Sequence, residues 1–155
     1  MCLCTLALAA CGRAASEAKP APQLGVADFQ ASAFLRRHPA KAMRSEGGAR
    51  IYSFADAYSE SERIEVALGP DPVRSITVRW VGEPDHPAQW SSVKKQFMAD
   101  LLESTFWDVD YGQVSSYLMD LHQPYADGPG APIGPARIRA GSSGSDLVVR
   151  LERQA

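Results

Sequence analysis

Residues 63–80 read RIEVALGPDPVRSITVRW, which is two runs of alternating apolar and polar residues on either side of a turn. Apolar side chains recur at every second position of both runs. They are Ile64, Val66, Leu68, Ile76, Val78 and Trp80. A period of two predicts strands with one buried and one solvated face. The intervening residues 69–72, Gly-Pro-Asp-Pro, are typical of a turn, so we expect an antiparallel hairpin.

Three further segments have strand character. Residues 50–55 are expected to pair with this hairpin through a polar turn at 59–62. Residues 137–140 and 147–153 are expected to form a second hairpin, with its turn in the glycine- and serine-rich residues 141–145. The sequence therefore predicts an antiparallel sheet of four or five strands.

Three segments show the helical period instead. The first spans residues 26–38 and ends at Pro39. The second is expected over residues 87–107, with Asp85 and His86 as candidate caps and Pro87 in its first turn. The third is expected to start at Asp110, with Gln113 as its capping-box partner. Together with the sheet, these segments predict an α+β fold with helices packed on one face.

The expected helices divide into buried and exposed faces. The buried positions are Trp90, Val93, Phe97, Leu101 and Leu102 on the second helix, and Val114, Tyr117, Leu118 and Leu121 on the third. The second helix is expected to turn its polar side chains away from the core. These are Lys94, Lys95, Asp100 and Glu103. Two segments are expected to be loops, residues 40–48 and the rigid run GPGAPIGP at residues 128–135.

The composition is that of one ordinary globular domain. The chain has 155 residues, of which 45% are hydrophobic and 22% are charged. Its formal net charge of -2 gives no field that would attract nucleic acid, so no nucleic-acid partner is expected. No apolar run approaches the length of roughly 20 residues that spans a bilayer.

The N-terminus contains all three cysteines, at positions 2, 4 and 11. Residues 1–10 are uncharged and apolar except for Thr5, and they end in a pair of small residues. The run Leu8-Ala9-Ala10-Cys11 resembles the lipobox of bacterial lipoprotein precursors. This resemblance implies that residues 1–10 are a signal peptide, that cleavage falls between Ala10 and Cys11, and that Cys11 carries acyl chains. No basic residue precedes the apolar run, so we expect the signal's basic region to lie upstream of Met1.

The same resemblance implies a location. Gly12 follows the cysteine where Asp would favour the inner membrane, so the expected site is the periplasmic side of the outer membrane, with the inner membrane as the alternative. Two or more acyl chains make a stable anchor. Residues 11–25 are rich in Ala, Pro and charge without a period, and are expected to be a flexible tether to a domain at 26–155.

No catalytic or metal-binding motif is evident. A G-x-S-x-G nucleophile elbow beginning at Gly141 would need glycine at position 145, where the chain has Ser145, and an elbow joins a strand to a helix. The histidines are His38, His86 and His122. All three lie near prolines at element ends, and none has a partner at metal-ligand spacing. The nearest cluster joins His86 to Asp85 and Glu83 and is interpreted as a capping region. We expect no catalysis, metal or cofactor.

Two groups of larger side chains remain. Trp80, Trp90 and Trp107 could stack on a glycan, but their places on predicted buried faces favour the core. The outward face of the sheet is expected to be rich in arginine, with Glu65 and Glu152 among them. The arginines are Arg79, Arg137, Arg139 and Arg150. A mixed-charge face of this kind is usually only solvated, but it is also what a contact surface for an anionic envelope polymer or a partner protein would look like.

These observations favour a lipid-anchored lipoprotein of the cell envelope that acts as a non-catalytic binding or assembly accessory. Its expected partners are the membrane, through the anchor, and an envelope protein. The alternative is an inhibitor or immunity protein against a periplasmic enzyme or toxin, with residues 128–135 as the plug. A third hypothesis, an enzyme, would rely on His86 and Asp85.

Overall fold

The computed structural model describes residues 23–55, 63–82, 90–105, 107, 109–120 and 130–154. Its helices and strands occur in separate groups along the chain, in an α+β arrangement. They are α1 (Val26–Gln30), α2 (Ala33–Arg37), β1 (Ala42–Glu46), β2 (Ala49–Ala55), β3 (Arg63–Leu68), β4 (Ser75–Val81), α3 (Ser92–Glu103), α4 (Tyr111–Met119), β5 (Ala131–Ile133), β6 (Ala136–Ser143) and β7 (Asp146–Arg153).

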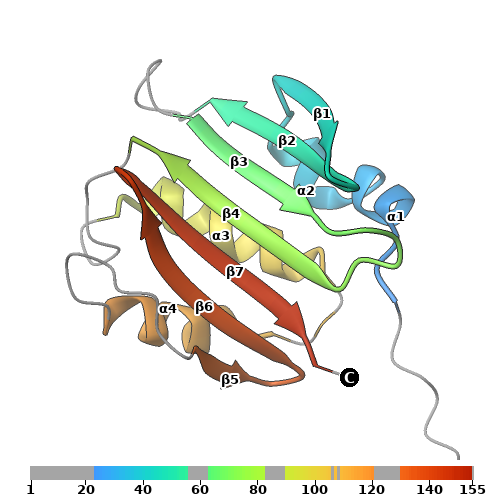
Figure 1. Ribbon diagram of the computed structural model, residues 1–155. Helices are drawn as coiled ribbons and strands as arrows, with labels where there is room; N and C mark the ends of the chain where they lie inside the picture. The colour runs from blue at the N-terminus through green and yellow to red at the C-terminus, as the bar shows by residue number, and fades with distance from the viewer. Residues whose placement is uncertain are drawn as a thin grey trace, which may run out of the picture.

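The strands form one antiparallel sheet in the order β1-β2-β3-β4-β7-β6-β5 (Figure 1). The predicted hairpins are confirmed, β3 with β4 and β6 with β7. Strand β7 then pairs with β4, which joins the two hairpins into a continuous sheet. The sheet has seven strands, so the expectation of four or five was too low.

The two additional strands lie at the edges, where loops were expected. Strand β1 falls within residues 40–48 and pairs with β2 through Gly47 and Gly48. Both glycines have positive φ, 56° and 82°, as a two-residue hairpin turn requires. Strand β5 falls within residues 128–135 and pairs with β6. Edge strands need only one partner, so short and irregular sequences suffice there.

The helices are shorter than expected. The segment 26–38 forms two helices because Ser32 interrupts it and caps α2, its Oγ accepting a hydrogen bond from Leu35 N at 3.3 Å. Helix α3 covers residues 92–103 rather than 87–107, and its N-cap is Ser91. Residues 85–87, the expected start, lie outside the described residues. Asp110 is confirmed as the N-cap of α4.

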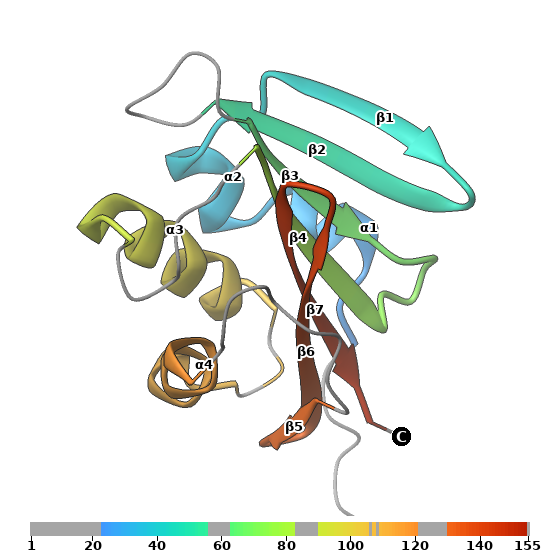
Figure 2. The ribbon, with the colours of Figure 1, turned by 60° about the vertical axis from the view of Figure 1, so that its left-hand side comes forward.

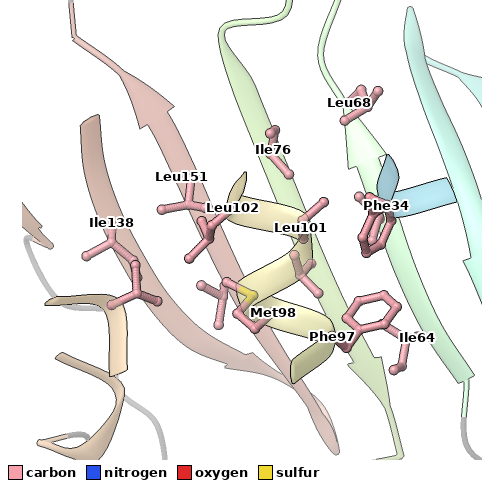
Figure 3. Close-up of a cluster of buried hydrophobic side chains, with 14 of the residues drawn as sticks. Phe34, Ile64, Leu68, Ile76, Phe97, Met98, Leu101, Leu102, Ile138 and Leu151 are labelled. Atoms are coloured by element: carbon pink, nitrogen blue, oxygen red, sulfur yellow. The ribbon is translucent and has the colours of Figure 1, made fainter. Parts of the chain in front are cut away.

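One face of the sheet carries the core. Phe29 of α1 packs on Tyr52 of β2, while Phe34 of α2 and Phe97 of α3 both pack on Phe54, with ring centroids 5.3 to 5.5 Å apart. Figure 2 shows α3 and α4 on the same side of the sheet, and Figure 3 shows the α3 side chains meeting those of β3, β4, β6 and β7. The apolar positions of the two quoted runs are all buried, as predicted.

The packed part of the chain starts before the first helix. Leu24 is fully buried and forms an antiparallel bridge with Val73, whose N–H donates to the Leu24 carbonyl at 2.8 Å. The three tryptophans are buried, which confirms their place in the core, and the rings of Trp80 and Trp90 lie 4.5 Å apart.

Candidate functional site

The second face of the sheet is open, and the alternation of the strands places polar side chains on it. No helix in the described residues covers it in either view of the ribbon (Figures 1 and 2). Arg79 of β4, Arg139 of β6 and Arg150 of β7 line one shallow hollow there, of about 400 Å³. We call this feature, together with its lining residues Ser142, Ser143, Val148 and Glu152, the arginine hollow. Three of the four arginines expected on this face thus lie together.

The fourth arginine is close by but does not line the hollow. Arg137 stands opposite Glu152 in the β6–β7 register and is half-buried. Arg139 stands opposite Arg150 in the same register. Directly opposed side chains of an antiparallel pair have Cβ atoms about 5 Å apart, and like charges in that position are destabilising. The arrangement therefore concentrates positive charge at a cost in stability.

Ion pairs with carboxylates balance only part of the positive charge of these arginines. Arg150 Nη2 lies 2.9 Å from Glu152 Oε1, and Arg79 Nη1 lies 3.8 Å from Asp146 Oδ2. Asp146 is also engaged by the N–H of Gly82, which donates to Oδ1 at 2.9 Å. Arg139 has no ion-pair partner among the residues that the structure describes. Counting only the described residues, the hollow brings together three arginines, of which Arg150 and Arg79 have the carboxylates of Glu152 and Asp146 as ion-pair partners, so one positive charge is left over.

The other half of the open face is neutralised. Glu65 of β3 accepts two hydrogen bonds from Arg44 of β1, at 3.1 and 3.2 Å, and lies 3.3 Å from Arg63 Nε. The hydrogen bond to Glu65 raises the pKa of the Arg44 guanidinium above its ordinary value. Glu65 was expected to be solvated but is buried beneath these arginines. Sequence reasoning missed Arg44 because it assigned that segment to a loop.

A second polar feature lies on the helical side. Asp100 of α3 was expected to face away from the core, but its side chain is only 4% exposed. It accepts hydrogen bonds from Arg37 Nη1 at 2.7 Å and from Gln96 Nε2 at 2.8 Å, and its Oδ2 lies 2.7 Å from His38 Nε2. Lys94 was also expected to be exposed and is buried. The helical period of the sequence separates an apolar face of α3 from a polar one. It gives no sign that α2 covers part of the polar face.

Burial and hydrogen bonding act in opposite directions on Asp100. Burial raises the pKa of a carboxyl group, and it is the largest single influence here. The hydrogen bonds from His38 and Gln96, together with the charge of Arg37, outweigh it and hold the pKa of Asp100 below its ordinary value. Asp100 is therefore an anion in the folded protein at neutral pH, and it orients the two basic side chains at the end of α2.

These basic side chains border a pocket of about 200 Å³. The pocket lies between the end of α2, the first turns of α3, and strands β2 and β3. We call it the α2–α3 pocket, and it is lined by Arg37, His38, Pro39, Lys41, Phe54, Ala55, Ile64, Val93, Lys94 and Phe97. Nothing in the sequence pattern pointed to this site, because its members come from four elements.

The remaining predicted positions lie outside the described residues. They are Ala10, Cys11, Glu83, Asp85, His86 and His122. Among the described residues, no group of three or more His, Cys, Asp or Glu side chains lies close enough together to hold a metal ion. Within the same part of the chain, no helix combines the length and the apolar character needed to cross a bilayer.

Comparison with known proteins adds no relative from which a role could be transferred. No protein-family model, no curated protein and no solved structure matches this chain. The function is therefore inferred from the residues and their geometry alone.

Proposed function

We propose that the protein is a lipid-anchored lipoprotein of the bacterial cell envelope, on the periplasmic side of the outer membrane. It acts there as a non-catalytic binding or assembly accessory. The Leu8-Ala9-Ala10-Cys11 run supports the anchor, and the arginine hollow supports the binding role. The folded domain would then present its open sheet face to a partner.

The observation that carries this proposal is the uncompensated charge of the hollow. Arg139 and Arg150 oppose each other across β6 and β7, and Arg139 has no ion-pair partner among the described residues. Exposed mixed-charge faces are usually only solvated, but around Glu65 opposite charges contact one another, whereas in the hollow two arginines are opposed. A like-charged pair gains its counter-charge when an acidic surface covers it.

The chemistry favours a folded partner with an acidic patch. A guanidinium is planar and binds carboxylates in a two-point geometry, which gives orientation as well as attraction. Arg79, Arg139 and Arg150 come from three neighbouring strands, so their backbones are fixed relative to one another. Three guanidinium groups that extend from a fixed framework suit carboxylates that are themselves held in fixed positions.

The test compares two double variants in capture of envelope components. The surface variant is Arg139→Glu with Arg150→Glu, which reverses the charge of the opposed pair and removes the exposed Arg150–Glu152 ion pair. The control is Arg36→Glu with Arg50→Glu, at exposed positions away from the hollow. We expect the wild-type protein and the control to retain the same component from detergent-solubilised envelopes, and the surface variant to bind it at least about tenfold more weakly.

Salt supplies a second readout. Binding through exposed charges weakens as the Debye length falls from about 10 Å at 0.1 M salt to about 3 Å at 1 M. Equal capture by the surface variant and the wild type, or capture that salt does not affect, would contradict the role of the hollow. No specific component in any sample would contradict the binding role itself.

The inhibitor alternative gains no support from the fold. Its candidate plug was the rigid loop predicted at residues 128–135, and of these, residues 131–133 are strand β5 and pair with β6 along the sheet edge. A strand held in a ladder does not project as a plug.

A further inference from the structure

We infer that the α2–α3 pocket binds a small ligand with an apolar body and a carboxylate group. This site lies on the helical side of the sheet, whereas the arginine hollow lies on the open face. The inference is therefore independent of the proposed partner surface. It rests on the shape of the pocket, on the chemistry of its floor and on the basic groups at its mouth.

The floor of the pocket is apolar and stiff. Phe54 and Phe97 pack edge to face, with centroids 5.3 Å apart, and Ile64 of β3 adjoins them. Figure 3 shows Phe97 and Ile64 together at one end of the core cluster, beside Phe34. The volume of about 200 Å³ exceeds the roughly 150 Å³ of an apolar cavity that holds benzene. The pocket therefore accommodates one aromatic ring or a short alkyl chain.

The mouth of the pocket is basic. Among the described residues, its lining includes Arg37, His38, Lys41 and Lys94 and no Asp or Glu. Asp100 lies behind this lining and balances one positive charge. The Lys41 side chain has no ion-pair partner in the part of the chain that the structure describes, and its backbone N–H donates to Ser53 O at 2.7 Å. An anionic head group at the mouth would gain the charge of Lys41 and the remaining donors of Arg37, while a neutral or cationic one would not.

Two of the basic groups are already oriented. The His38 ring packs against Phe34 and Phe97, with centroids 5.1 and 5.0 Å away, and Asp100 engages its Nε2. Arg37 uses only Nη1 in its contacts with Asp100 and Glu103, so its Nε and Nη2 donors face no described partner. Groups that are fixed before binding lose less entropy when a ligand arrives, so this geometry favours affinity.

The experiment titrates the full chain with 3-phenylpropionate and follows backbone amide shifts by NMR. Acetate lacks the ring and 3-phenylpropanol lacks the charge, so they serve as the two control ligands. We expect saturable shifts at Phe54, Val93 and Phe97 with 3-phenylpropionate. Acetate should give no saturable shifts. 3-Phenylpropanol should bind at least about two- to fivefold more weakly than 3-phenylpropionate, because it lacks the charge that interacts with the basic groups.

Two variants locate the site. Lys41→Gln removes one exposed charge at the mouth and should weaken 3-phenylpropionate binding by about two- to fivefold. Lys95→Gln is the matched control on α3, since Lys95 does not line the pocket, and it should leave the affinity unchanged. Val93→Phe fills the pocket and should abolish the saturable shifts while the spectrum remains that of a folded protein.

Three results would overturn the inference. The first is the absence of saturable shifts in the wild-type protein. The second is a set of shifts that maps to the open face instead of the pocket. The third is equal binding of 3-phenylpropionate and 3-phenylpropanol, or equal effects of Lys41→Gln and Lys95→Gln, which would remove the carboxylate from the proposed chemistry.

Discussion

At the scale of single residues, Asp100 connects the packing of α2 to that of α3. Its carboxylate accepts hydrogen bonds from Arg37 on α2 and from Gln96 on its own helix, and it contacts His38 just beyond α2. A buried carboxylate is costly unless such partners satisfy it. We infer that this cluster fixes the angle at which α2 lies against α3, and with it the mouth of the α2–α3 pocket.

Replacing the carboxylate should destabilise the protein. Asp100→Asn keeps the shape and the bond from Gln96 but removes the charge that Arg37 and His38 contact. We expect the free energy of unfolding at pH 7 to fall by about 2 kcal/mol, which is typical for a lost hydrogen bond to a charged group. Urea denaturation of the wild type and of Asp100→Asn measures this difference in unfolding free energy. Glu103→Gln is the control on the exposed face of the same helix, and an equal loss in both variants would contradict this role.

The same residue predicts the direction of the pH dependence. Because the pKa of Asp100 is lowered in the folded state, its carboxylate stabilises the fold above its ordinary pKa of about 3.9. That contribution is lost as the pH falls through the folded-state pKa, below about pH 4. The difference in unfolding free energy between the wild type and Asp100→Asn should therefore narrow between pH 5 and pH 3. A difference that stays constant over this range would contradict the assignment.

At the scale of elements, helix α3 depends on a cap that the periodicity did not identify. Ser91 Oγ accepts a hydrogen bond from Lys94 N at 3.3 Å and so satisfies one of the free N–H groups of the first turn. We expect Ser91→Ala to lower the free energy of unfolding by about 1 kcal/mol. Ser92→Ala is the matched control, because Ser92 is exposed and already helical. Thermal or urea unfolding of both variants checks this, and a larger loss for Ser92→Ala would refute the cap.

The elements also show which parts of the fold a single sequence can predict. Strands β3, β4 and β7 could be predicted because apolar residues occupy every second position, on the face that packs in the core, although Glu65 on the other face of β3 is buried as well. Strand β1 has five exposed residues and thus no burial pattern that could produce alternation, and its turn glycines resembled a loop. Helix α3 revealed its apolar stripe, but Asp100 looked solvated because the element that covers it is distant in sequence. Local periodicity carries no information about contacts between elements that are distant in sequence.

At the scale of the molecule, the two candidate sites lie on opposite sides of one sheet. The same alternation that sends Ile76, Val78 and Trp80 into the core sends Arg79 to the open face. The arginines of that face could be predicted from strand register alone, and three of the four meet in one hollow. The α2–α3 pocket could not be predicted, because it requires α2, α3, β2 and β3 to be docked. The α2–α3 pocket shares Phe54, Ile64 and Phe97 with the core, whereas the arginine hollow lies outside it, so only the hollow can be altered without touching the contacts between the sheet and the helices.

The anchor itself is the last property that can be tested on the whole protein. Each buried methylene of an acyl chain contributes about 0.8 kcal/mol to membrane binding. The two or three chains that a lipobox cysteine receives would therefore decide whether the protein is found in the membrane or in the aqueous phase. We expect the protein, expressed with its complete signal, to incorporate labelled palmitate and to enter the detergent phase on phase separation. Cys11→Ser should lose both properties, and Cys4→Ser should keep them, because the proposed cleavage before Cys11 would remove Cys4. Unchanged labelling of the Cys11→Ser protein, or loss of labelling in Cys4→Ser, would refute the lipobox and leave the binding surfaces without their proposed address.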